Sequence, residues 1–236
     1  MQKKSYKNQC PTKSKTVIRE VANKDRLKKE KKLMADSLVE FDREYQKKYR
    51  SVGGTDEAGR GPLAGPVCCA AVIMPLDAEK IVPGVDDSKK IPEKKREILY
   101  ESIIKNAVCY GVAFVTHSEI DEINILNASK KGMLACYNSL AEKPGIFLID
   151  AVKLDLQNSE SIIKGDAKSY NIACASILAK VSRDRLMRGY DATYPGYGFA
   201  RHKGYGTAAH YAAIEKFGIT PIHRKTFLKN ILKKDD

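Results

Sequence analysis

Apolar runs and helical stretches alternate along most of this chain. Residues 67–74 (VCCAAVIM) form a continuous apolar run between Pro66 and Pro75, which is typical of a buried strand. Further strands are predicted at residues 107–115, 146–149 and 162–163, and helices at 92–105, 125–140, 170–187 and 207–217. Strands that alternate with helices predict an α/β domain with a mixed, partly parallel sheet.

Residues 23–48 show a helical spacing of apolar side chains among Lys and Glu. Five of these side chains are separated by 7, 4, 3 and 4 residues and therefore share one stripe: Leu27, Met34, Leu38, Phe41 and Tyr45. The stripe predicts a helix packed on the body of the protein. A coiled-coil seam is the alternative, but it needs heptads sustained over more turns. Gly53 and Gly54 are interpreted as the end of this region.

Composition divides the chain into four parts. Residues 1–16 are polar, rich in Lys and broken by Pro11, and they are predicted to be a disordered basic tail. Residues 17–49 are predicted to be an amphipathic basic helical extension. The α/β domain, with a short C-terminal helical segment, is expected at 50–228, and a polar tail at 229–236. The sequence contains no internal repeat.

Positive charge is concentrated at the two ends of the chain. The 236 residues include 42 Lys and Arg against 29 Asp and Glu, a net charge of +13. Residues 1–50 carry +9 and residues 201–236 carry +5, which leaves −1 for the middle. A near-neutral body with two basic ends favours a nucleic acid as partner, while ends that only keep the protein soluble are the alternative.

Cysteine usage and the lack of a long apolar segment bear on location. The chain has six cysteines: Cys10, Cys68, Cys69, Cys109, Cys136 and Cys174. They form no CxxC pair, no His stands at metal-ligand spacing from them, and most of them have apolar neighbours. This usage is typical of a reducing compartment. The N-terminus lacks the apolar segment of a secretory signal, and no stretch is suited to crossing a membrane. We therefore expect a cytoplasmic monomer with no membrane partner.

Acidic residues stand where predicted strands end. Asp56 and Glu57 follow the two glycines, Asp150 ends the run IFLI, and Asp166 ends the run IIKG. An apolar strand does not readily carry a carboxylate at its tip unless the group reaches solvent or a cation, because burying an unpaired charge is unfavourable. A single Asp at such a place is more often a turn former or a helix cap. The four together predict one cluster.

A cluster of carboxylates repels itself unless hard divalent cations neutralise it. Two Mg²⁺ ions held ~4 Å apart by oxygen ligands are the standard device for in-line cleavage of a phosphodiester. The motifs around these acids contain neither His nor Cys, which favours Mg²⁺ or Mn²⁺ over zinc.

Seven ordered motifs resemble the ribonuclease HII family over about residues 50–228. The segment GGTDEAGRGPLAGPVCCAAVI (53–73) is similar to the family signature, in which an Asp-Glu pair precedes a Gly-Arg-Gly loop. The other motifs follow in the family's order: DDSKK (86–90), LIDA (148–151), KGDAKSYNIACASILAKVSRDR (164–185), YPGYGF (194–199), HKGYGT (202–207) and PIHRKTF (221–227). Residues 1–49 lie outside the resemblance.

The resemblance implies the ribonuclease H-like fold, a mixed sheet flanked by helices, and a set of site residues. It implies that the catalytic, metal-binding acids are Asp56, Glu57, Asp150 and Asp166. It also implies that Gly59, Arg60 and Gly61 sense the ribose 2′-OH through backbone contacts, and that Tyr205 stacks on the deoxyribose at the RNA–DNA junction. The family often has Gly after the third acid, where this chain has Ala151, a departure that matters only if the backbone there needs a positive φ.

The implied activity is that of an endonuclease. It hydrolyses the phosphodiester 5′ to a ribonucleotide in RNA–DNA hybrids, and at single ribonucleotides embedded in duplex DNA, leaving a 3′-OH and a 5′-phosphate. Such a reaction serves DNA replication and repair. The 2′-OH alone distinguishes RNA from DNA at one nucleotide, so a specific enzyme must contact it.

Two alternatives remain at this point. One is the ribonuclease HIII family, which shares the fold of ribonuclease HII but lacks the Gly-Arg-Gly loop. The N-terminal extension of ribonuclease HIII contains strands, whereas residues 17–49 of this chain are predicted to be helical. A non-catalytic basic protein that binds structured RNA would explain the net charge of +13. It would leave the acids at the strand ends unexplained.

Several residues are weaker candidates. Phosphate binding is possible for Ser88, Lys89 and Lys168, although exposed lysines usually contact only water. Asp184 beside Arg183 favours a structural ion pair, with a reserve role as a metal ligand. His223 and Arg224 either support the active site from the C-terminal segment or serve packing alone. The four histidines are interpreted as too scattered to form a site.

Overall fold

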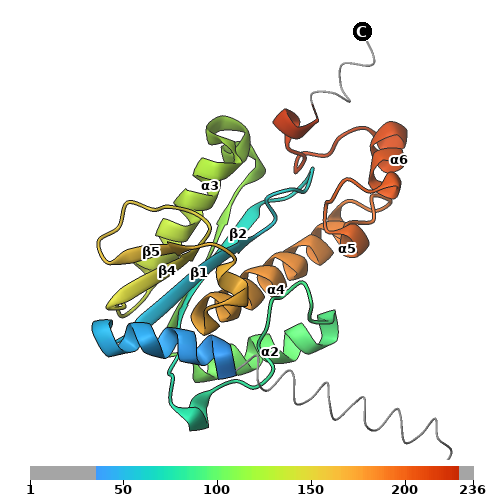
Figure 1. Cartoon of the computed structure of the whole chain (residues 1–236). Coiled ribbons are helices and arrows are strands. Elements are labelled where there is room, and N and C mark those ends of the chain that lie inside the picture. Colours follow the sequence, from blue (N-terminus) through green and yellow to red (C-terminus); the bar gives the residue numbers. More distant parts are fainter. Residues whose placement is uncertain (1–35, 229–236) are drawn as a thin grey trace, which may run out of the picture.

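The computed structural model describes residues 36–228, which form a mixed sheet with helices on both faces (Figure 1). The strands are β1 (Val52–Ala58), β2 (Val67–Ile73), β3 (Cys109–Val115), β4 (Ile146–Asp150) and β5 (Ser159–Ile162). They lie in the order β3-β2-β1-β4-β5. β1 pairs antiparallel with β2, and β2 with β3, whereas β1 pairs parallel with β4, and β4 with β5. The predicted α/β fold with a mixed, partly parallel sheet is confirmed.

The helices cover the sheet and extend beyond one end of it. They are a helix at residues 36–49, α2 (Glu93–Asn106), α3 (His117–Ser139), α4 (Tyr170–Thr193), α5 (Phe199–His202) and α6 (Ala208–Phe217). Three short 3-10 turns, η1 (Ala78–Lys80), η2 (Gly165–Ala167) and η3 (Lys225–Phe227), complete the described elements. No helix within residues 36–228 is long and apolar enough to cross a membrane.

The apolar run of β2 fills two cores because alternate side chains point to opposite faces of a sheet. Cys68, Ala70 and Val72 face a core shared with α2, α4 and the helix at 36–49. Cys69 and Ala71 face the core beneath α3. A strand buried on both sides therefore reads as continuous apolar sequence, and its cysteines serve as small apolar side chains.

The central strand β1 is where the sequence interpretation was wrong. Gly53 and Gly54 do not end the N-terminal region; they lie inside β1. A Cβ on Gly54 would come within 2.4 Å of the main-chain atoms of Asn171 and Ile172. Glycine thus lets the start of α4 cross directly over β1, which brings that helix close to the acids further along the strand.

Two helices also extend beyond their predicted bounds. α3 begins at His117 rather than at 125, because Thr116 and Glu119 form a capping box there. A kink at Asn124, with φ of 65°, follows. α4 continues past Met187 to Thr193. The first turns of α3 are polar, so apolar spacing gave no signal for them.

The helix at residues 36–49 packs on the body as its stripe predicts. Leu38 is buried in the core with α2 and α4, while Phe41 and Tyr45 pack beside Val52 and the strand β4. Leu27 and Met34, the other stripe residues, lie outside the described residues, as do the predicted tails at 1–16 and 229–236. The four-part division of the chain stays a prediction.

Asp42 of this helix is buried against the first turn of α4. Its Oδ2 accepts hydrogen bonds from the main-chain N–H and the side-chain amide of Asn171, both at 2.8 Å. Burial raises the pKa of Asp42 to about 6, against the opposing effect of hydrogen bonds from Ser169 and Asn171. A folded-state pKa above the unfolded value stabilises the fold at low pH. That stabilisation is lost as the pH rises through 6.

Asp42→Asn is therefore expected to gain stability over the natural protein as the pH rises from about 4 to about 8. The gain at the upper end is on the order of 3 kcal/mol, because Asn carries no charge to bury and its oxygen can still accept from Asn171. Urea unfolding of both proteins across this pH range measures it. A difference in unfolding free energy that does not change with pH would contradict the burial argument.

The predicted C-terminal helical segment forms a small separate core at the far end of α4 (Figure 1). Its apolar residues come from α4, α5, α6, the loop after β1, and the segments before α5 and after α6: Leu63, Ala64, Met187, Tyr197, Phe199, Ala213, Ile214, Ile222 and Leu228. Main-chain hydrogen bonds join the loop after β1 to the C-terminal segment, since Leu63 N–H donates to Gly204 O and Gly65 N–H donates to Ile222 O. This second core holds the loop after β1 against the C-terminal segment.

Candidate active site

Sheet register brings the acids together. Thr55 of β1 lies opposite Ile149 of β4, so the next residues along the two parallel strands, Asp56 and Asp150, are neighbours. Asp166 joins them from η2, because the N–H of the preceding Gly165 donates to Asp150 Oδ1 at 2.6 Å. Asp150 ends its strand as predicted. Asp56 instead lies inside β1, and Asp166 lies in a 3-10 turn after β5 rather than at a strand end.

Burial and mutual repulsion raise the pKa values of the carboxyl groups of Asp56, Glu57 and Asp150. For Asp56 burial is the largest cause, followed by the charges of Glu57 and Asp150. Burial also raises the pKa of Glu57 against the opposing charge of Arg60, whose Nη1 lies 3.5 Å from Glu57 Oε1. Burial and then Asp166 raise that of Asp150. The positive charge near the cluster, such as that of Arg60, is therefore too small to balance the negative charges of the carboxylates.

The donor set suits a hard divalent cation. Glu57 Oε2 is buried and has no hydrogen-bond partner among the described residues, so one carboxylate oxygen of the cluster is unsatisfied. Only oxygen ligands are present in the cluster, which is the set that Mg²⁺ and Mn²⁺ take. Within residues 36–228 no three His, Cys, Asp or Glu side chains are already close enough to hold one ion together.

Lys89 supplies part of the missing positive charge. Its Nζ lies 3.6 Å from Asp166 Oδ2. Burial lowers the pKa of Lys89, but the carboxylates of Asp166 and Asp56 outweigh that effect and raise it. A single ammonium balances the cluster only partly, because the cluster contains four acids.

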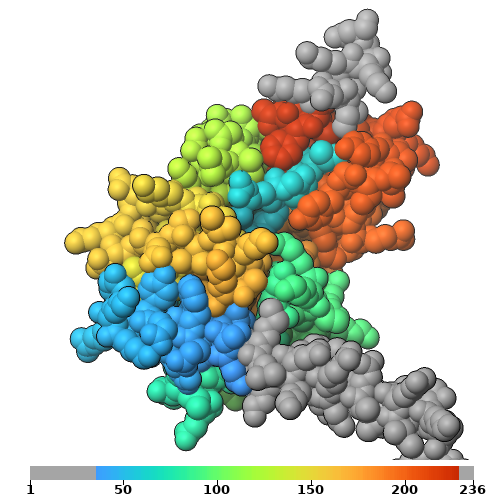
Figure 2. Space-filling model, in the orientation of Figure 1, coloured from blue at the N-terminus to red at the C-terminus, as the bar shows by residue number. Residues whose placement is uncertain are grey.

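A cleft beside the acids gathers most of the other predicted residues. It is lined by Glu57, Ala58, Gly59, Arg60, Gly61, Ser88, Lys89, Ser176, Lys180, Arg183 and Tyr205. Gly59, Arg60 and Gly61, called the 59–61 loop below, form one wall. The Tyr205 ring also lines the cleft and lies next to this loop, since a Cβ built on Gly61 would lie 3.7 Å from Tyr205 Cε1. In the space-filling view this region lies between the gold segment near residue 165 and the orange C-terminal segment (Figure 2).

Lys168 is the exception among the substrate-binding candidates. It is exposed in the turn after Asp166 and is not among the residues that line the cleft. Ser88, in contrast, is buried at the floor, with its Oγ 2.9 Å from Ser176 Oγ of α4.

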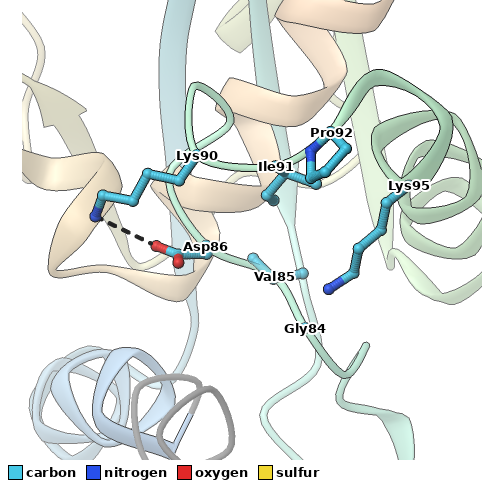
Figure 3. A pocket seen from close by; sticks show the side chains of 7 residues that line it. All are labelled: Gly84, Val85, Asp86, Lys90, Ile91, Pro92 and Lys95. Atoms are coloured by element: carbon cyan, nitrogen blue, oxygen red, sulfur yellow. Dashed lines mark ion pairs between the residues drawn. The ribbon is translucent and has the colours of Figure 1, made fainter. Parts of the chain in front are cut away.

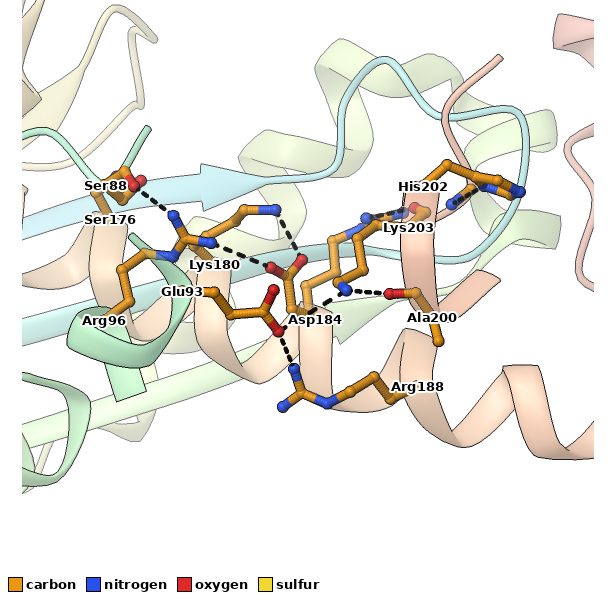
Figure 4. A network of polar contacts seen from close by, with 12 residues as sticks. Ser88, Glu93, Arg96, Ser176, Lys180, Asp184, Arg188, Ala200, His202 and Lys203 are labelled. Carbon is orange, nitrogen blue, oxygen red and sulfur yellow. Dashed lines mark hydrogen bonds and ion pairs between the residues drawn. The ribbon is translucent and has the colours of Figure 1, made fainter. Parts of the chain in front are cut away.

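Asp184 belongs to a structural ion pair and not to the acid cluster (Figure 4). Its Oδ1 lies 2.7 Å from Lys180 Nζ, and its Oδ2 lies 3.7 Å from Arg96 Nη2. Arg96 in turn donates to the carbonyl oxygens of Ser88 and Ile91, which ties the loop carrying Ser88 to α4. Asp184 therefore forms ion pairs as predicted, but with Lys180 and Arg96 and not with the neighbouring Arg183. Arg96 is a residue that sequence patterns gave no reason to select.

The same loop borders a second, smaller pocket on its other side (Figure 3). Its lining comprises Gly84, Val85, Asp86, Lys90, Ile91, Pro92 and Lys95. Asp86 and Lys90 are paired there at 3.6 Å. None of the predicted site residues lines this pocket, so we place the chemistry in the first cleft.

The interpretation of the histidines as scattered was wrong for three of them. His202 and His210 stack with ring centroids 4.5 Å apart, and His210 Nε2 lies 3.1 Å from His223 Nε2. Spacings of eight and thirteen residues hide this contact in the sequence.

The hydrogen bonds of these rings run in one direction. The N–H of Thr220 donates to His223 Nδ1, so the proton of His223 is on Nε2 and is donated to His210. His210 Nδ1 then donates to the carbonyl oxygen of Tyr205 at 3.0 Å. Burial lowers the pKa of His210, and that of His223 to about 4, which keeps both rings neutral near pH 7. The chain of bonds fixes the backbone of Tyr205.

Ala151 sits where the backbone does need a positive φ. Its φ is 49°, directly after Asp150, and side chains with a Cβ are disfavoured in this left-handed region. The departure from Gly noted in the sequence therefore carries a cost in stability.

Ala151→Gly is expected to raise the free energy of unfolding by about 0.5–1 kcal/mol, because Gly adopts this conformation without the Cβ clash. Denaturant unfolding measures the change. Ala212→Gly, on the exposed face of α6, serves as the control and should lose about 1 kcal/mol. If Ala151→Gly instead lowered the free energy of unfolding by about 1 kcal/mol, as the control does, the backbone at Ala151 would not be strained.

Comparison with known proteins gives a consistent result. A family model described as Ribonuclease HII matches residues 53–230. A ribonuclease HII of Acetivibrio thermocellus is 51% identical over 219 residues, which cover 91% of this chain and 85% of the relative. Another, of Caldicellulosiruptor bescii, is 54% identical over 186 residues, covering 78% of this chain and 89% of the relative.

Solved structures show the same fold. The ribonuclease H2 of Pyrococcus horikoshii superimposes with a TM-score of 0.65 at 27% identity, covering 78% of this chain and 98% of that one. The ribonuclease HII in the Archaeoglobus fulgidus complex with PCNA is similar in fold, with a TM-score of 0.59 at 22% identity over 75% of this chain and 94% of that chain.

Proposed function

Because this chain belongs to the ribonuclease HII family, we propose that it hydrolyses the phosphodiester on the 5′ side of a ribonucleotide paired with DNA, leaving a 3′-OH and a 5′-phosphate. The chain is a hydrolase that acts on RNA in RNA–DNA hybrids, in a family that depends on divalent metal ions. The proposal adds the cut position and a second substrate, the single ribonucleotide embedded in duplex DNA.

The main support for the proposal is that the four acids lie next to a cleft that contains the predicted substrate-binding residues. Asp56, Glu57, Asp150 and Asp166 meet where β1 and β4 adjoin. The cleft next to them is lined by both the 59–61 loop and the Tyr205 ring. A phosphodiester over the acids therefore places its ribose beside backbone amides.

We assign the cation-binding role to these four acids, with Mg²⁺ or Mn²⁺ as the ions. Bound there, such ions supply activation of the attacking water and stabilisation of the leaving 3′-oxyanion. The chain's own contribution is to hold carboxylate oxygens in a buried cluster whose repulsion favours cations. The unsatisfied Glu57 Oε2 is a ligand ready for one of them.

Recognition of the substrate falls to the walls of the cleft. The 59–61 loop lets backbone amides approach the 2′-OH, since Gly59 and Gly61 have no side chain in the way. Tyr205 offers its ring face to the sugar of the next nucleotide, and its half-exposed position leaves that face free. We assign phosphate binding to Lys89 and Ser88, which line the cleft, and keep Lys168, exposed in the turn after Asp166, as a third candidate.

The alternatives lose their support. Ribonuclease HIII is set aside because the family that matches is ribonuclease HII and the Gly-Arg-Gly loop lines the cleft. A non-catalytic RNA-binding protein would have no use for a cluster of four acids. Cytoplasmic location remains a proposal, supported by the free thiols of the described cysteines. A monomeric form is also a proposal.

Mapping of cleavage products tests the proposal. The substrate is a labelled duplex with one ribonucleotide, and the matched control is the same duplex made wholly of DNA. We expect one cut 5′ to the ribonucleotide, with a 3′-OH that a DNA polymerase extends and no cut in the control. Products ending in a 2′,3′-cyclic phosphate would show that the ribose itself attacks, which would overturn the proposed reaction.

A further inference from the structure

A buried arginine lies behind the 59–61 loop. Arg224 is fully buried, and each nitrogen of its guanidinium donates to a main-chain carbonyl oxygen of the chain between β1 and β2. Nη2 donates to Gly59 O at 2.6 Å, Nη1 to Arg60 O at 2.9 Å, and Nε to Gly65 O at 2.9 Å. A planar fork of donors thus fixes several peptide groups of one loop at once.

These bonds set the direction of the loop's amides. In a trans peptide the C=O of one residue and the N–H of the next point in opposite directions, and no cis peptide occurs in the described residues. When Arg224 holds the carbonyls of Gly59 and Arg60, the N–H groups of Arg60 and Gly61 must point away from Arg224. Among residues 36–228 neither N–H donates to any other group.

The side opposite Arg224 is the substrate cleft. Arg60 and Gly61 line that cleft, whereas Arg224 does not. The two free N–H groups therefore face the space beside the acids. Hydrogen bonds that run in series polarise one another, so a cationic group bound to the carbonyl side also strengthens these N–H groups as donors.

Arg183 of α4 supports the same loop from another direction. A Cβ on Gly59, where φ is +97°, would lie 2.0 Å from Arg183 Nε, so the loop rests directly on this side chain. Arg183 donates to Pro66 O and Ala64 O beyond the loop and to Lys203 O near Tyr205. Arg183 therefore binds on either side of the loop. Within residues 36–228, only Arg224 donates to the carbonyl oxygens of Gly59 and Arg60 themselves.

We propose that Arg224 is a positioning residue that aims the N–H groups of Arg60 and Gly61 at the ribose 2′-oxygen. The inference rests on the proposed function, since it takes the 2′-OH as the group recognised. Arg224 touches neither substrate nor cation. Its effect should appear in the distinction between ribose and deoxyribose, and not in metal use or in general affinity for duplex DNA.

The test compares two constants for each protein. One is kcat/KM on a duplex with a single ribonucleotide, and the other is Ki for the same duplex made of DNA, added as a competitor. Arg224→Lys keeps the charge but cannot hold both carbonyls, and Arg224→Gln removes the charge as well. Arg185→Gln, an exposed arginine bound to Glu97 and Glu101, is the control for the loss of one positive charge.

For Arg224→Lys we expect kcat/KM to fall about tenfold, as the loss of one well-placed hydrogen bond would cause, with a larger fall for Arg224→Gln. Ki for the DNA duplex should stay within about twofold, as should the metal concentration for half-maximal rate. The control should match the natural protein.

Two results would overturn the inference. An unchanged kcat/KM in Arg224→Lys would show that the loop does not need this clamp. A parallel weakening of kcat/KM and Ki would show that the residue serves only the fold. Failure of the proposed function looks different, because the natural protein itself would then not distinguish the ribonucleotide duplex from DNA.

Discussion

Asp56→Asn and Asp150→Asn are each expected to abolish cleavage while leaving the fold intact. Each change removes a carboxylate from the place where β1 and β4 adjoin. The loss should exceed the roughly 10- to 100-fold that follows removal of an outer partner of a metal ligand, because the ligand itself is lost. Single-turnover cleavage of a duplex with one ribonucleotide, at saturating Mg²⁺, measures it.

Stability of the same variants separates loss of chemistry from loss of fold. Burial raises the pKa of Asp56, so its ionised form works against the metal-free fold as the pH rises through that pKa. Asp56→Asn without metal should therefore be at least as stable as the natural protein near pH 7. Asp155→Asn, the same substitution at an exposed site after β4, should keep normal activity and stability. Near-normal turnover in Asp56→Asn or Asp150→Asn would show that the metal assignment is wrong.

Tyr205→Ala is expected to lose roughly ten- to 150-fold in rate on a single embedded ribonucleotide. A stacking contact is worth about 1–3 kcal/mol, and about 1.4 kcal/mol corresponds to tenfold in rate. Tyr205→Phe should lose little, because the ring face makes the contact rather than the hydroxyl. The backbone of Tyr205 is held by His210 in either variant, so the loop should stay in place.

The choice of substrate decides the role of Tyr205. The loss should be largest on the embedded ribonucleotide and smaller on a long RNA–DNA hybrid, where cuts need no junction with DNA. Tyr110→Ala on the edge strand β3 is the control, since that ring is about as exposed, at 41% against 44%. Equal losses on the two substrates would reduce Tyr205 to a packing residue.

Much of the site could be predicted because short motifs carry it. The alternation of apolar runs and helical stretches predicted the mixed sheet, and acids near strand ends predicted the cluster. The 59–61 loop and Tyr205, named from the resemblance, do line one cleft. Their roles in binding stay predictions that the variants above test.

What sequence patterns missed depends on contacts between distant segments. β1 was missed because its two glycines weaken a strand signal, although the close crossing of α4 requires one of them. The histidine cluster and the clamp by Arg224 join residues far apart in the chain. A buried Arg that bonds only to carbonyl oxygens has no local pattern, since its partners lie some 160 residues away.

Cleavage with and without a chelator tests most directly whether the four clustered acids work through divalent cations. The substrate is the duplex with one embedded ribonucleotide, incubated with the full chain in excess EDTA, to which Mg²⁺ or Mn²⁺ is then added beyond the chelator. The account predicts no cleavage in EDTA and full return of the cut 5′ to the ribonucleotide with either ion. Cleavage at that position in EDTA at an undiminished rate would contradict it.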